Sequence, residues 1–139
     1  MADSFSTQVD KFVVDSEAKL LAVTQTAIES MIEESQTPVG QGGRMRVDTG
    51  FLRSSGLASL EHIPSGPGKG EKSGFYSWTG SPLAVVLAKM KIGDTFYWGW
   101  TANYAKYREA YDGFMEAALM NWQRHVDAAV AKLKGRMSK

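Results

Sequence analysis

The clearest pattern in the chain is an apolar stripe that runs through its first 35 residues. Its members recur at spacings of three and four: Phe5, Val9, Phe12, Ser16, Leu20, Val23, Ala27 and Met31. Such spacing places side chains on one face of an α-helix. With Asp3 or Ser4 as cap, it predicts one helix over residues 3–35, about 45 Å long. Since this is long for a small domain, we expect part of the stripe to protrude and pack on a neighbouring subunit.

The pattern changes after Thr37-Pro38, because the residue before a proline resists helix and glycines follow. Candidate strands in the middle of the chain are residues 56–61, 75–78, 83–88 and 95–101. The run 83–88 is apolar throughout, which fits a buried strand or a helical turn, and its two adjacent valines favour a strand. We expect it to form an antiparallel hairpin with 95–101 across Gly93-Asp94.

The remaining segments complete a single α+β domain over residues 1–139. Six glycines and prolines in residues 62–74 predict a flexible loop. Tyrosines at helical spacing predict a short helix before a break at Asp112-Gly113, and residues 114–137 carry the stripe of a final helix. The expected fold is a long N-terminal helix, a small antiparallel β-sheet and a long C-terminal helix packed on one face of the sheet.

Charge is distributed unevenly, although the net charge is only +1. Residues 1–36 hold seven acids and two lysines, whereas Arg124 to Lys139 hold five basic residues and one acid. These runs could be solvated helix faces. They could also let copies dock head to tail, or let the basic C-terminal helix bind nucleic acid.

Composition excludes several classes of function. The absence of cysteine excludes disulfides and thiolate metal sites. His62 and His125 lack metal-site spacing, and Glu71 replaces the second glycine that a phosphate-binding loop over residues 66–73 requires. With no signal peptide and no apolar membrane span, we expect a soluble protein that is intracellular at synthesis.

Residues 46–55 mark the change from helix to sheet and contain the sequence motif that is most informative about function. Asp48 or Thr49 can cap a following helical turn, Gly50 permits a turn, and Leu52 offers an apolar anchor. Asp48-Thr49-Gly50 also matches the signature of a small dimeric aspartic protease, in which paired carboxylates activate water. That loop should follow an apolar strand in an all-β protein, whereas a glycine- and arginine-rich segment precedes it here. The flanking residues therefore favour a turn.

Two blocks together carry a resemblance to a known family. Val-Asp-Thr-Gly-Phe-Leu-Arg-Ser-Ser at 47–55 and Asn-Tyr-Ala-Lys-Tyr-Arg-Glu at 103–109 resemble motifs of the siphophage tail-completion or neck proteins, minor tail components of the head–tail connector. The blocks occur in the family's order, one after a long acidic helix and one before a C-terminal helix. The Gly-Thr and proline that usually follow the second block in the family are missing from residues 110–118.

The resemblance implies an α+β virion protein without cofactor that forms a homo-oligomeric ring at the head–tail joint. The expected neighbours are the connector or head-closure protein and the tail tube protein, with DNA passing through the channel and no membrane involved. It would be located in the virion, and in the host cytoplasm during assembly. Asp48 would cap the turn and Arg53 would point to a neighbour or to its own acidic helix. The candidate motif and interface residues are Asp48, Thr49, Gly50, Leu52, Arg53, Tyr104, Tyr107, Arg108 and Glu109.

Overall fold

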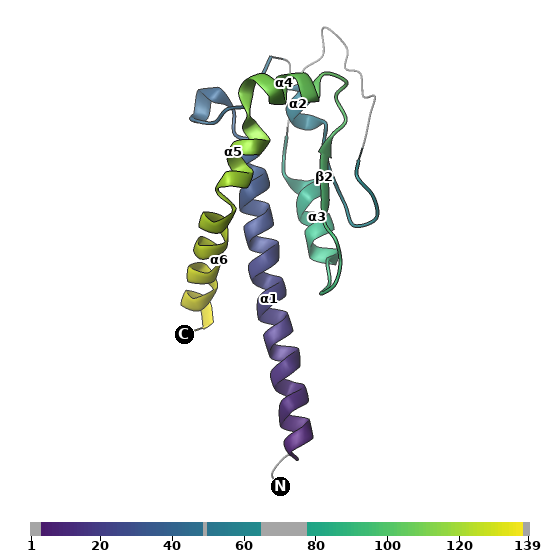
Figure 1. Ribbon diagram of the computed structural model, residues 1–139, viewed down its shortest axis with the longest axis vertical. Coiled ribbons are helices and arrows are strands. Elements are labelled where there is room, and N and C mark those ends of the chain that lie inside the picture. The colour runs from purple at the N-terminus through teal and green to yellow at the C-terminus, as the bar shows by residue number, and fades with distance from the viewer. Residues whose placement is uncertain (1–3, 49, 65–77, 138–139) are drawn as a thin grey trace.

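A long helix, α1 (Phe5–Ser35), is the axis of the molecule (Figure 1). The computed structural model describes residues 4–48, 50–64 and 78–137. The Ser4 side chain accepts a hydrogen bond from the Thr7 backbone N–H at 3.2 Å and so caps the helix. Ser4 is one of the two residues expected to do so. The helix ends at the C-cap residue Gln36, just before Thr37-Pro38. The predicted long helix is confirmed.

Among the described residues, those that cover α1 lie along its C-terminal half. Its buried residues are Ala27, Ile28, Ile32 and Ser35. The C-terminal helix α6 (Trp122–Met137) runs back along α1 and stops well before the N-terminus of α1, whose first turns project alone (Figure 1). Every residue from Phe5 to Leu20 is exposed.

The sheet confirms the α+β class and two of the predicted strands. The other elements are η1 (Val39–Gln41), α2 (Phe51–Ser54), β1 (Gly56–Ser59), α3 (Ser81–Lys89), β2 (Tyr97–Trp100), α4 (Ala105–Asp112) and α5 (Phe114–Met120). Strands β1 and β2 pair antiparallel, with Gly56 opposite Trp100 and Ser59 opposite Tyr97. They form a two-stranded sheet among the described residues.

The prediction of a strand over 83–88 and of a hairpin with 95–101 is wrong. The segment is the helix α3, and the partner of β2 is β1. Leu83, Leu87 and Met90 recur at helical spacing and are buried against α1, whereas Val85 is 54% exposed. Pro82 in the first turn also suits a helix start. The burial of apolar side chains three and four positions apart favours a helix here, and it outweighs the preference of the two valines for a strand.

The predicted C-terminal helix differs in two respects. It is broken at Asn121 into α5 and α6, and α6 packs along α1 rather than on a face of the sheet. The predicted break after α4 is confirmed, since Gly113 ends that helix in the left-handed conformation with φ of 64°. The predicted loop 62–74 and strand 75–78 fall largely on residues 65–77, which lie outside the described residues.

Two apolar clusters hold the described elements together. One joins α1 to α3 and the sheet through Ile28, Ile32, Leu83 and Leu87. The other contains Met45, Leu52, Ala102 and Phe114 and lies where α2, α4 and α5 meet. A series of edge-to-face aromatic contacts links the clusters. Its ring-centroid distances are 5.6 Å for Trp78–Trp98, 5.7 Å for Trp98–Trp100 and 4.9 Å for Trp100–Phe114.

Candidate functional site

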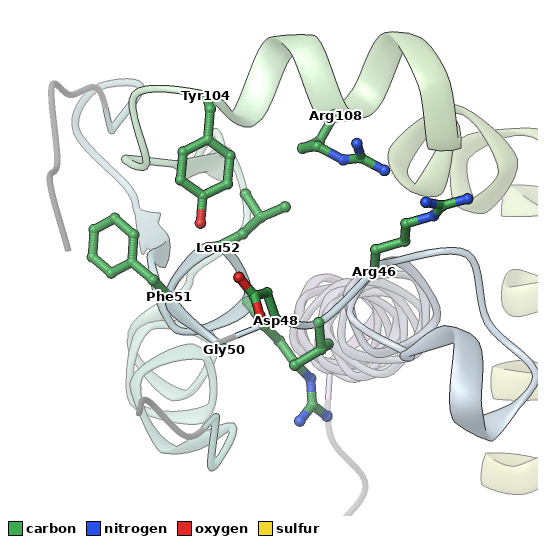
Figure 2. Close-up of a pocket in the computed structure, with 9 residues that line it drawn as sticks. Arg46, Asp48, Gly50, Phe51, Leu52, Tyr104 and Arg108 are labelled. Carbon is green, nitrogen blue, oxygen red and sulfur yellow. The ribbon is translucent and has the colours of Figure 1, made fainter. Parts of the chain in front are cut away.

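The two sequence blocks that carry the family resemblance meet in space and line one pocket (Figure 2). The pocket has a volume of about 510 Å³. Its lining residues come from the loop before α2, from α2 itself and from the first turn of α4: Arg46, Val47, Asp48, Gly50, Phe51, Leu52, Arg53, Tyr104 and Arg108. Six of the candidate residues therefore lie together, namely Asp48, Gly50, Leu52, Arg53, Tyr104 and Arg108. Thr49 lies outside the described residues.

Backbone contacts fix the loop that enters the pocket. Met45 is fully buried; its N–H donates to the Thr37 carbonyl at 3.3 Å, and its own carbonyl accepts from the Val39 N–H at 2.9 Å. Gly50 then adopts φ of 87°, a conformation that favours glycine, and is the N-cap residue of α2. The expectation that Asp48 holds this cap position is thus wrong, because the N-cap residue is Gly50, two positions later, and no side chain caps the helix. Asp48 is exposed at the pocket.

Leu52 and Arg53 anchor α2 to the body in different ways. Leu52 is 4% exposed and packs in the second apolar cluster, as predicted. Arg53 donates from Nε to the carbonyl of Gln36 at 2.8 Å, a bond that satisfies a free carbonyl at the C-terminal end of α1. Of the two orientations expected for Arg53, the structure has the one toward its own N-terminal helix.

Gln36 is a buried residue at this junction that the sequence analysis missed. Its side chain is held at both ends: Nε2 donates to the Arg53 carbonyl at 2.7 Å, and Oε1 accepts from the Trp100 indole N–H at 2.8 Å. A glutamine between a helix end and Thr37-Pro38 gives no sequence signal for such a role, since both partners are distant in the chain. Gln36 ties α1, α2 and β2 to one another.

Tyr104 and Phe51 form another wall of the pocket. Their ring centroids are 6.4 Å apart. The Tyr104 hydroxyl and the Asp48 carboxylate face the same space (Figure 2). Burial raises the pKa of the Tyr104 phenol, a hydrogen bond with the Leu52 backbone lowers it, and the charge of Asp48 raises it. Tyr104 is therefore a neutral hydroxyl at physiological pH.

Arg108 and Arg46 place positive charge at the opposite side of the pocket (Figure 2). Arg108 makes a bidentate pair with Asp112, with Nη2 to Oδ1 at 2.8 Å and Nε to Oδ2 at 3.2 Å. The Asp112 side chain is 8% exposed and also lies 3.8 Å from Arg46 Nε, while the Arg46 side chain is 74% exposed. The pocket thus presents an exposed guanidinium held near a buried carboxylate.

The other two candidates on α4 have different roles. The Glu109 carboxylate accepts hydrogen bonds from the Met115 and Glu116 backbone N–H groups, both at 2.9 Å, and so caps the start of α5. Tyr107 is 60% exposed and Tyr111 is 85% exposed. These two tyrosine rings therefore lie at the surface of α4.

The surroundings of Asp48 differ from the context that the protease hypothesis requires. The protease hypothesis needed an apolar strand before Asp48, but the chain there is a 3-10 turn and a loop. In the described residues, no group of three or more histidine, aspartate or glutamate side chains could hold a metal ion. No helix in that part of the chain is long and apolar enough to cross a membrane. Comparisons with protein-family models, curated proteins and solved structures each found no match.

Proposed function

We propose that this chain is a structural virion protein that forms a ring at the phage head–tail joint. It would mate the tail tube to the connector and leave a channel for DNA. The observation that carries the proposal is the meeting of the two resembling blocks in one pocket. Residues that are far apart in sequence but share a surface are what a docking site for a neighbouring protein requires.

Two further features support an assembly role. The acidic N-terminal region and the basic C-terminal region make the monomer electrostatically asymmetric. Such asymmetry suits head-to-tail contacts, in which one surface of a copy meets a different surface of the next and a ring closes. The projecting half of α1 also leaves large apolar side chains without cover from the described chain, and such surfaces mark interaction sites.

In this proposal the pocket receives a segment of the adjoining protein. Asp48 can accept hydrogen bonds, the Tyr104 hydroxyl can donate one, and Arg46 can pair with a carboxylate. The ring contact between Phe51 and Tyr104 supplies an apolar wall. The work is mechanical, so no bond is made or broken and no cofactor is needed.

The proposal is tested in the phage whose genome encodes the chain. When the coding sequence is deleted, electron microscopy should show DNA-filled heads and separate tails, and expression of the chain in trans should restore joined particles. Heads that join tails normally without the chain would refute the proposal.

A matched pair of variants on α4 tests the role of the pocket. Tyr104→Phe removes only the hydroxyl and should restore joining poorly. Tyr111→Phe removes the same group from an exposed side chain that does not line the pocket, so it should restore joining fully. Equal activity of the two variants would show that the pocket hydroxyl has no part in docking.

A further inference from the structure

The free half of α1 carries a continuous apolar face. Phe5 is 81% exposed, Phe12 is 72% exposed, and Val9 and Val13 are 41% and 45% exposed. These residues continue the side of the helix that, farther along, carries Val23 beside α6. The surface that α6 covers in one part of α1 is therefore bare in the other (Figure 1). We call residues 5–14 the free segment.

A second apolar surface begins where the free segment ends. The last turns of α6 and the middle of α1 border a groove of about 340 Å³, which exposes almost only apolar surface. It is lined by Ala18, Lys19, Ala22, Val23, Val130, Leu133 and Lys134. The free segment of the same chain cannot fold back into it, because both belong to one continuous helix.

The charges around the two surfaces are opposite. Residues 4–17 carry three acids and one lysine: Asp10 and Lys11 lie within the free segment, and Asp15 and Glu17 lie between it and the groove. The groove is flanked by Lys19 and Lys134, with Lys132 exposed nearby on α6. An apolar helix face in a net acidic N-terminal part of the chain and an apolar groove edged by lysines are complementary in hydrophobicity and in net charge.

We propose that the free segment of one copy docks in the α1–α6 groove of a second copy, with Phe5 and Phe12 as its apolar anchors. The inference rests on the proposed function, since it names the contact between copies in the ring. Each copy offers one free segment and one groove, so every segment can be covered and contacts can pass from copy to copy.

The two anchors supply part of the area that such a contact needs. A phenylalanine buries about 150–250 Å² in a core or interface, so the two anchors alone supply roughly 300 Å². Stable interfaces bury about 800 Å² on each partner. The two anchors therefore supply under half of one partner's share, and the remainder has to come from the other exposed side chains of the free segment, including Val9 and Val13.

Cysteine crosslinking tests the contact directly, because the natural chain has no cysteine. Lys134 and Lys19 both line the groove. Lys19 lies about 20 Å from Phe5 along α1. A disulfide needs Cα atoms within about 7 Å, so Phe5→Cys and Lys134→Cys can be linked only between copies. Mixing the two single variants under mild oxidation should give a covalent dimer of the two different chains. Phe5→Cys mixed with Lys91→Cys, whose side chain is exposed just after α3, is the control.

Light scattering over a dilution series gives the second measurement. Phe5→Ser with Phe12→Ser should weaken self-association at least about tenfold, since both anchors lose apolar burial. Val85→Ser with Ile92→Ser replaces similarly exposed side chains elsewhere and should leave association unchanged. Circular dichroism would confirm that both double variants keep the helical content of the wild type.

The outcomes separate this inference from the proposed function. Three results would each overturn the inference. They are no self-association of the wild type, association of the double phenylalanine variant as strong as that of the wild type, or crosslinking of Phe5→Cys to Lys91→Cys as strong as to Lys134→Cys. The function would still stand if deletion of the chain leaves heads and tails unjoined. Joined particles without the chain would refute the function, whatever the crosslinking shows.

Discussion

Replacing Gln36 with leucine tests how the end of α1 is fastened to the candidate site. Gln36 is 1% exposed, and its side chain satisfies both the Arg53 carbonyl and the Trp100 indole N–H. Leucine fills similar volume but forms neither bond. A buried polar group left without a partner costs about 1–3 kcal/mol. Because the added apolar burial offsets part of two such costs, we expect a loss of about 2–4 kcal/mol from the free energy of unfolding. The Arg53 bond to the Gln36 backbone carbonyl remains.

Urea unfolding followed by circular dichroism and tryptophan fluorescence measures this loss. Gln25→Leu is the matched control, since the Gln25 side chain makes a single bond, to the Leu87 carbonyl at 2.7 Å. It should cost about half as much. A double-mutant cycle with Trp100→Phe isolates the indole bond. In that background Gln36→Leu should cost about 1 kcal/mol less, because no indole N–H is left unpaired.

A loss below about 0.5 kcal/mol for Gln36→Leu would refute this reasoning, since surface substitutions reach that size without any specific cause. Strict additivity in the cycle with Trp100→Phe would also contradict the indole bond. A large loss for Gln36→Leu with additivity would place the cost in the Arg53 carbonyl alone.

Three other changes have defined outcomes. Gly113→Ala forces alanine into φ of 64° and should cost about 1–2 kcal/mol in urea unfolding, whereas Gly135→Ala, within α6, should be neutral or stabilising. Glu109→Ala removes the carboxylate that caps α5 and should cost about 0.5–2 kcal/mol; a cost no greater than that of Glu116→Ala would contradict the cap. Burial, and after it the charge of Glu29, raises the pKa of Glu33 above its ordinary value of 4.5. The folded state therefore binds a proton at Glu33 more tightly than the unfolded state does. The stability that this proton contributes is present at low pH and is lost as pH rises through the folded pKa. Glu33→Gln should therefore raise the melting temperature at pH 7, and its difference from the wild type should vanish below pH 4.5. A difference that grows as the pH falls would mean that the pKa of Glu33 is lowered rather than raised.

Sequence alone was enough where structure depends on neighbouring residues. The stripe, with Asp3 or Ser4 as candidate cap, defined α1, because a helix repeats its contacts every three or four positions. Gly113 marked a helix end, since glycine reaches the left-handed conformation at low cost. The two blocks at 47–55 and 103–109 contain most of the residues that line the pocket, but the sequence did not show that the blocks meet.

Tertiary contacts decided the rest. Residues 83–88 have a sequence that fits either strand or helix, and burial of Leu83 and Leu87 against α1 selected the helix. That choice removed the expected hairpin partner of β2 and left β1 to pair with it. The site likewise depends on Gln36, whose partners Arg53 and Trp100 become neighbours only after the chain folds. Local periodicity fixes which face of an element is apolar, but the partner of that face is set by packing over the whole chain.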